Sequence, residues 1–166
     1  MTKLMPSYSL WSYISSKSPA EDLRLFRELA RGAYVQTFNP EAVGGAKHLE
    51  LTLKQTWMLM KSGQLLAKKP EVDFLQRVAG TTQIGRAVKV AGARPEEVSL
   101  LVLFGDPSTI GRAGRTLAKR VKLVKATPSV GKQAASRLED KRRAAVVGVN
   151  EPDAYLLAED AALLRR

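Results

Sequence analysis

The sequence predicts an α+β fold: a single domain, residues 1–166, with a small mixed β-sheet surrounded by several helices. The length of 166 residues suits one domain with one sizeable core. Segments typical of strands alternate with segments of helical periodicity, and no repeat, low-complexity tract or long linker divides them. Apolar residues make up 45% and charged residues 26%, a composition that indicates a globular protein.

The first half of the chain predicts two strands and two helices. Residues 8–14 are rich in Tyr, Trp, Leu and Ile, which favours a strand. Ser18 is followed by proline and an acid, so a helix is expected to begin there and to end at Gly32. Residues 33–38 predict a second strand, and residues 45–62 a second helix. The apolar face of that helix carries Leu49, Leu53, Trp57 and Met60.

Three more helices and a central strand are expected after it. Residues 70–80 and 83–90 have helical spacing, with a glycine at the end of the first. The continuous apolar run 100–104 predicts a strand buried on both faces. Asp106 is placed to cap the following helix, which the basic spacing extends to Lys122. Capping accounts for Asp106 better than catalysis does.

The last quarter of the chain is harder to assign. A weak helical pattern covers residues 133–138, and residues 144–147 form a short apolar segment. Residues 155–164 are apolar enough for a terminal element, and periodicity leaves open whether it is a strand or a helix.

Positive charge is concentrated in one part of the chain. Lys and Arg total 27 against 16 acids, a net charge of +11. Residues 108–143 hold eleven basic residues against Glu139 and Asp140, which gives +9 of that total. Such a balance favours polyanionic partners, nucleic acid first and an acidic protein or membrane surface next. Four of these residues share the spacing of one helix face, which indicates either phosphate contacts or a solvated surface: Arg112, Arg115, Lys119 and Lys122.

Residues suited to catalysis or to metal binding are scarce. The chain has no cysteine and one histidine, His48, so thiolate chemistry and Cys-based zinc sites are excluded. The phosphate-loop-like residues 128–132 lack the first glycine and the final hydroxyl of that motif. We therefore expect no enzyme, no cofactor and no metal. The lack of cysteines, of a signal segment and of a long apolar run favours a cytoplasmic protein without a membrane anchor.

Residues 77–84, Arg-Val-Ala-Gly-Thr-Thr-Gln-Ile, give a more specific indication of function than the net charge does. They resemble a family of KEOPS-complex subunits that includes the PRPK-binding protein of eukaryotes and its archaeal counterparts. In that family a helix ends in a small residue and glycine, and Gln-Ile opens the next helix. Residues 47–49, 91–93 and 155–164 resemble other family segments in the same order. One departure is Thr82, where many relatives have arginine.

The resemblance implies a non-catalytic subunit with no small-molecule substrate of its own. Such a subunit binds the kinase-like ATPase of KEOPS and recruits tRNA through its CCA 3′ end for threonylcarbamoyladenosine modification. The implied tRNA contacts are Lys47, His48, Arg77, Gln83 and Arg86, to which the charge pattern adds Arg112, Arg115, Lys119 and Lys122. The expected kinase-subunit interface is Ile84, Ala87, Val88 and Ala91.

Several of these assignments have a simpler reading beside them. His48 either stacks on a base or caps and packs at its helix start, and Gln83 either bonds a base edge or bonds the backbone there. The small residues on the helix 83–90 permit close approach of a partner or packing in the core. The alternative function is a free-standing basic RNA- or ribosome-binding protein.

Overall fold

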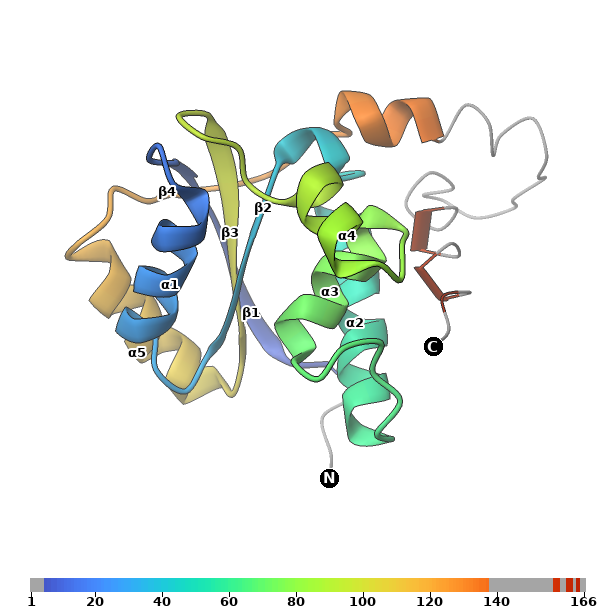
Figure 1. Ribbon diagram of the computed structural model, residues 1–166. Coiled ribbons are helices and arrows are strands. Elements are labelled where there is room, and N and C mark those ends of the chain that lie inside the picture. Colours follow the sequence, from blue (N-terminus) through green and yellow to red (C-terminus); the bar gives the residue numbers. More distant parts are fainter. Residues whose placement is uncertain (1–4, 138–156, 159–160, 163, 165–166) are drawn as a thin grey trace.

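The computed structural model describes residues 5–137, 157–158, 161–162 and 164, and it confirms the α+β class (Figure 1). Residues 132–137 are helical, and so are 157–158 and 161–162, which identifies the terminal element as helical where it is described. No helix in these parts of the chain is long and apolar enough to cross a membrane. The elements in chain order are β1 (Ser7–Ile14), α1 (Pro19–Leu29), β2 (Tyr34–Phe38), the 3₁₀ helix η1 (Pro40–Ala42), α2 (Ala46–Lys61), α3 (Pro70–Ala79), α4 (Ile84–Ala91), β3 (Val98–Gly105), α5 (Pro107–Ala118) and β4 (Val124–Lys125).

The four strands of the described chain form one sheet in the order β2-β3-β1-β4. Every neighbouring pair is antiparallel, so the expectation of a mixed sheet is corrected. Strands β1 and β2 point in the same direction, but β3 lies between them and prevents a parallel pair. This strand order is that of two interleaved split β-α-β units, the ferredoxin-like arrangement, with η1, α2, α3 and α4 inserted between β2 and β3. The edge strand β4 was not expected, because two residues carry no periodicity.

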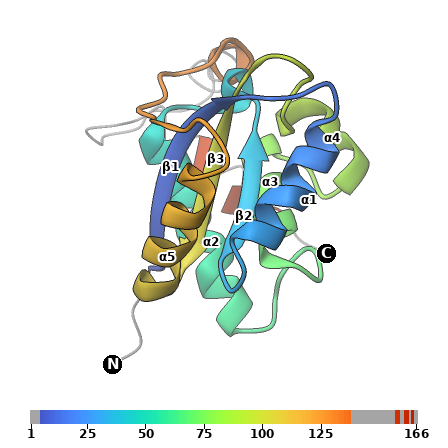
Figure 2. The ribbon, with the colours of Figure 1, turned by 90° about the vertical axis from the view of Figure 1, so that its left-hand side faces the viewer.

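Helices cover both faces of the sheet. In Figure 1, α1 and α5 lie on one face, and α2, α3 and α4 lie on the other. Figure 2 shows the molecule from the side of α1 and α5. The three helices on the second face all come from the connection between β2 and β3. The sheet is therefore the middle of three layers.

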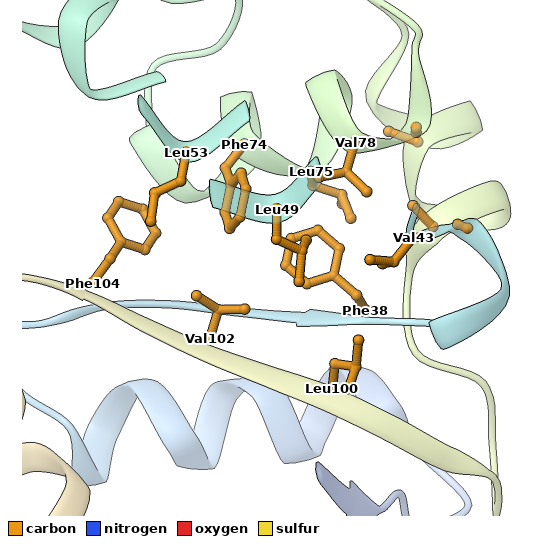
Figure 3. Close-up of a cluster of buried hydrophobic side chains, with 14 residues drawn as sticks. Phe38, Val43, Leu49, Leu53, Phe74, Leu75, Val78, Leu100, Val102 and Phe104 are labelled. Atoms are coloured by element: carbon orange, nitrogen blue, oxygen red, sulfur yellow. The ribbon is translucent and has the colours of Figure 1, made fainter. Parts of the chain in front are cut away.

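Each face of the sheet has its own hydrophobic core, and β3 contributes to both. On the α2–α4 side, Phe104 and Phe38 pack edge-on against Phe74 of α3, with ring centroids 5.6 and 4.9 Å apart (Figure 3). On the other side, Leu101 and Leu103 pack with Phe26 of α1 and with residues of α5. This confirms the expectation that residues 100–104 form a strand buried on both faces. Burial of this much apolar surface is the main term that stabilises such a domain.

The boundaries of α5 differ from the expected ones at one end only. Asp106 caps the helix as expected, because its carboxylate accepts hydrogen bonds from the Ser108 hydroxyl and the Thr109 amide, which lower its pKa. The helix ends at Ala118, so Lys122 lies beyond it, which corrects the expected extension. The helical pattern at residues 133–138 is confirmed as far as residue 137, while residues 144–147 lie outside the described residues.

Candidate RNA-binding and partner-binding surfaces

The segment that carries the family resemblance forms a tight junction between α3 and α4. Gly80 takes the left-handed conformation, with φ at 71°, and ends α3. The amide of Thr81 donates to the Gln76 carbonyl oxygen at 3.0 Å, which closes the helix end. Gln83 is the N-cap residue of α4 and is exposed, although its side chain makes no capping hydrogen bond. The glycine-broken junction expected from the sequence is thus present.

Two side chains that sequence reasoning missed brace this junction. Buried Gln76 donates from its side-chain amide to the Thr82 carbonyl oxygen at 2.6 Å. Arg137 donates to the carbonyl oxygen of Val78, near the end of α3, at 3.1 Å. Arg137 is 59 residues from Val78 in the sequence, so no local pattern could have identified it. The junction is held from two directions.

Alanine at position 80 is expected to destabilise the protein by about 1–2 kcal/mol, because the left-handed conformation strains any residue with a Cβ. The added Cβ would also lie 2.6 Å from Arg137 Nη2. Denaturant unfolding measures the change. Gly85→Ala is the matched control: a Cβ there meets nothing within 4 Å, and its helical position predicts unchanged or higher stability. Equal midpoints for the two variants would contradict this role of Gly80.

Arg77 is part of the core and does not face RNA, which corrects the expectation of a phosphate contact. Its side chain is 1% exposed. The guanidinium donates to both carboxylate oxygens of Asp73, at 2.8 and 3.2 Å, and its third nitrogen donates to the carbonyl oxygen of Ala161 at 2.6 Å. Asp73 also accepts from Thr56 and from the Leu66 amide. Arg77 therefore joins α3 to the C-terminal segment.

His48 is fully buried, so the structure contradicts base stacking and agrees with capping and packing. Its Nδ1 accepts a hydrogen bond from the Gly44 amide at 2.9 Å, just before α2 begins. Burial, and secondarily the positive charge of Arg137, lowers the pKa of the imidazole from 6.5 to about 3. The ring is therefore neutral at physiological pH.

The remaining contacts expected on this side of the sheet are on the surface. Gln83 and Arg86 are exposed at the start of α4. Lys47 is half-buried on the first turn of α2 and forms an ion pair with Glu50 at 3.2 Å. All three therefore stay candidates for RNA contacts.

A second group of basic side chains lies on the other face of the sheet. We call Arg112, Arg115, Lys119 and Lys122, on α5 and just after it, the α5 strip; all four are exposed. The apolar side of the helix faces the core through Ile110, Ala113 and Leu117. The sheet separates this strip from α2 and α4, as Figure 1 shows, so the expected RNA contacts do not converge on one site.

The expected kinase-subunit interface divides into exposed and buried residues. Ile84 and Val88 are 51% and 54% exposed, so both present apolar surface to solvent. Ala87 and Ala91 are fully buried, so the expectation that they meet a partner is corrected: their small side chains let α4 pack closely on the core.

Ile84 and Val88 border an apolar hollow of about 230 Å³ between α1 and α4. Leu23 of α1 and Leu75 of α3 also line it, and its floor lies at the edge strand β2. The amide of Thr37 in β2 is already paired with the side chain of Gln36, and that of Asn39 with the carbonyl oxygen of Ala91. A partner is thus expected to bind here through side chains rather than by adding a strand.

The sheet itself is not an RNA platform. RNA-binding domains with this strand order stack unpaired bases on aromatic side chains of an open sheet face. Here α2 and α3 cover that face, and Phe38 and Phe104 pack inside against Phe74. RNA contacts must therefore come from helix surfaces and loops.

The described chain is thus an α+β domain with an apolar hollow at the β2 edge of its sheet, between α1 and α4, and a basic strip on α5. No model of a known protein family matches the chain, and a search of curated proteins finds no match. Among the described residues, no three His, Cys, Asp or Glu side chains are grouped as a metal site would require.

Proposed function

We propose that the protein is a non-catalytic subunit of a KEOPS-type complex that binds a kinase-like ATPase and recruits tRNA for threonylcarbamoyladenosine modification. The resemblance of residues 77–84 to that family of subunits supports the proposal. The observation that carries the proposal is the separation of two surfaces: an apolar hollow at the β2 edge of the sheet, between α1 and α4, and the basic α5 strip over the face of the sheet. Such a domain has room for a protein and an RNA at the same time.

The protein partner is assigned to the hollow between α1 and α4 at the β2 edge of the sheet. Ile84 and Val88 expose apolar surface beside a hollow whose lining is mostly apolar, and burial of that surface would favour association. Arg27 also lines the hollow, where it lies 3.9 Å from Glu71. A central apolar contact with a polar rim is the usual arrangement of a protein interface.

The RNA backbone is assigned to the α5 strip, with the α4 start as a second contact. Arg112 and Arg115 are one helical turn apart on an exposed face, so their charges repel each other by a few tenths of a kcal/mol. Phosphates would offset that repulsion and release counterions, which makes binding depend on salt. Gln83 and Arg86 are exposed where the 3′ end could be read.

The test measures both partners with the same variants. Ile84→Ser/Val88→Ser, which removes the apolar surface without adding charge beside Gln83 and Arg86, is expected to abolish pull-down of the kinase-like ATPase and to leave tRNA affinity within about twofold. Arg112→Gln/Arg115→Gln is expected to leave the pull-down unchanged and to weaken tRNA binding. It is also expected to reduce the salt slope of tRNA binding by roughly 0.7–0.9 per residue. Lys54→Gln/Lys68→Gln removes the same charge from exposed positions on the other side and is the control. An unchanged slope in the α5 variant, together with retained pull-down in the α4 variant, would refute the proposal.

A free-standing RNA-binding protein is the second candidate, and the α5 strip favours it because these residues lie where the family resemblance is poor. The two candidate functions are distinguished by comparing the affinity for full-length tRNA with the affinity for tRNA that lacks its CCA end. Loss of affinity with the shortened tRNA supports the KEOPS-type subunit. Equal affinity supports the free-standing protein.

A further inference from the structure

A second hollow, of about 500 Å³, opens where β1 ends and β3 begins. We call it the sheet-end hollow. Ser12, Val98 and Leu100 of the sheet line it, η1 forms one wall, and residues 125–132 form the other. It lies on the α2–α4 face of the sheet, because Leu100 belongs to the core on that side. Its volume falls within the ~300–1,000 Å³ typical of small-ligand sites.

The wall formed by residues 125–132 is fixed to the rest of the fold. Gly131 donates its amide hydrogen bond to the Val43 carbonyl oxygen at 2.8 Å, and Val130 forms a β-bridge with Gly44. A Cβ at position 131 would collide with the carbonyl oxygens of Pro40 and Glu41, so only glycine permits this approach. The hollow is therefore a built feature and not a chance gap between loops.

Its lining combines two kinds of surface. Val98 and Val130 are 54% and 44% exposed, so the hollow presents apolar surface to solvent. Exposed Lys125 and Lys132 also line it, together with hydroxyl groups such as that of Ser12. A ligand that suits this lining has a flat apolar part, polar edges and an anionic group.

We propose that the sheet-end hollow takes one unpaired nucleotide of an RNA chain. The base packs against Val98 and Val130, its edges meet hydroxyl groups, and its phosphate lies near Lys125 and Lys132. None of the lining residues is aromatic, so the base is held by aliphatic contact and by its edges. This proposal rests on the proposed function only in that the partner is RNA, and it adds a site separate from the α5 strip.

The chemistry favours an unpaired nucleotide over an acidic peptide or a duplex. The Glu41 carboxylate lines the hollow and forms an ion pair with Arg94 at 3.1 Å. This carboxylate can accept hydrogen bonds from the amino group of a base, and a base has a flat apolar face for Val98 and Val130 to cover, which acidic side chains lack. A duplex hides its base edges and is too wide to enter a hollow of this volume.

The experiment uses the full chain and a labelled single-stranded RNA of ten nucleotides, with a blunt duplex of the same sequence beside it. Val98→Glu places a carboxylate in the hollow, and Val130→Asn removes an aliphatic contact without a change of charge. Each is expected to weaken single-strand binding at least about fivefold. Met58→Glu, at a 50% exposed position on α2, is the control for an added acid and is expected to leave affinity unchanged. Lys125→Gln/Lys132→Gln is expected to reduce the salt slope by roughly 0.7 per lysine.

Competition by adenosine monophosphate distinguishes a free nucleotide from a nucleotide within a chain. Weak displacement, at concentrations far above the affinity for the oligonucleotide, supports the chain. Displacement at equal concentration would show that the hollow serves a free nucleotide and would overturn the RNA assignment. Single-strand binding that is unaffected by both Val98→Glu and Val130→Asn would also overturn it. If Arg112→Gln/Arg115→Gln still weakens tRNA binding in that case, the proposed function stands and only the assignment of a nucleotide to the sheet-end hollow is wrong.

Discussion

Replacement of Asp73 with alanine is expected to lower the free energy of unfolding by about 3–5 kcal/mol. Asp73 and Arg77 are both essentially inaccessible to solvent, and the carboxylate is the only charged group bonded to this guanidinium among the described residues. Without it, the positive charge stays buried with no counter-charge, and the Leu66 amide and the Thr56 hydroxyl lose their acceptor. Urea unfolding monitored by circular dichroism measures the loss.

The double variant Asp73→Leu/Arg77→Met is the informative control. It removes both charges and fills similar volume with apolar atoms, so it is expected to recover a large part of the loss. If Asp73→Ala costs less than about 1 kcal/mol, or if the double variant is as unstable as the single one, the pair does not contribute as the geometry indicates.

Acid is expected to destabilise the protein through His48. The folded-state pKa of about 3 lies below the unfolded value of 6.5, so the unfolded chain binds more protons between these values. The stability due to neutral His48 is complete above pH 6.5 and is lost as the pH falls towards 3. The free energy of unfolding is expected to fall by up to about 1.4 kcal/mol per pH unit in that window, several kcal/mol in all.

Comparison with His48→Asn isolates this effect from other groups. The asparagine side-chain oxygen keeps an acceptor for the Gly44 amide, which donates to the histidine in the native protein, but asparagine does not titrate. Stability measured from pH 7.5 to pH 4 is expected to decline less steeply in the variant, whatever its value at neutral pH. Parallel pH profiles for the two proteins would show that His48 is not protonated on unfolding.

Local signals in the sequence predicted most of the fold. Gly80 marked the end of α3, Asp106 marked the start of α5, and the apolar run at residues 100–104 marked the central strand. These features act within a few residues, so the sequence displays them directly. The end of α5 was misplaced because basic residues at helical spacing continue to Lys122 although the helix does not.

Burial of polar residues was the main thing that the sequence could not show. Arg77 and His48 have side chains typical of nucleic-acid contacts. The four-residue spacing of Asp73 and Arg77 permits an ion pair on one helix face, but it does not show that this pair is buried. The division between buried Ala87 and exposed Val88 on α4 also depends on where α3 lies. The braces Gln76 and Arg137 and the sheet-end hollow depend on contacts between distant segments, so only the structure identifies them.

The strand order has a consequence for how the chain is made. Strand β1 pairs along its whole length with β3, and Ser7 lies opposite Gly105, so Ser7 leaves the ribosome about a hundred residues before its partner. Strand β2 can pair with β3 only after β3 has been made. Helix α3 contacts both α2 and α4, so these three neighbours can pack as soon as they emerge. We expect the inserted helices to form early and the sheet to assemble late, around β3. Strand β1 is made before β2, so it stays unpaired in the nascent chain for longer than β2 does.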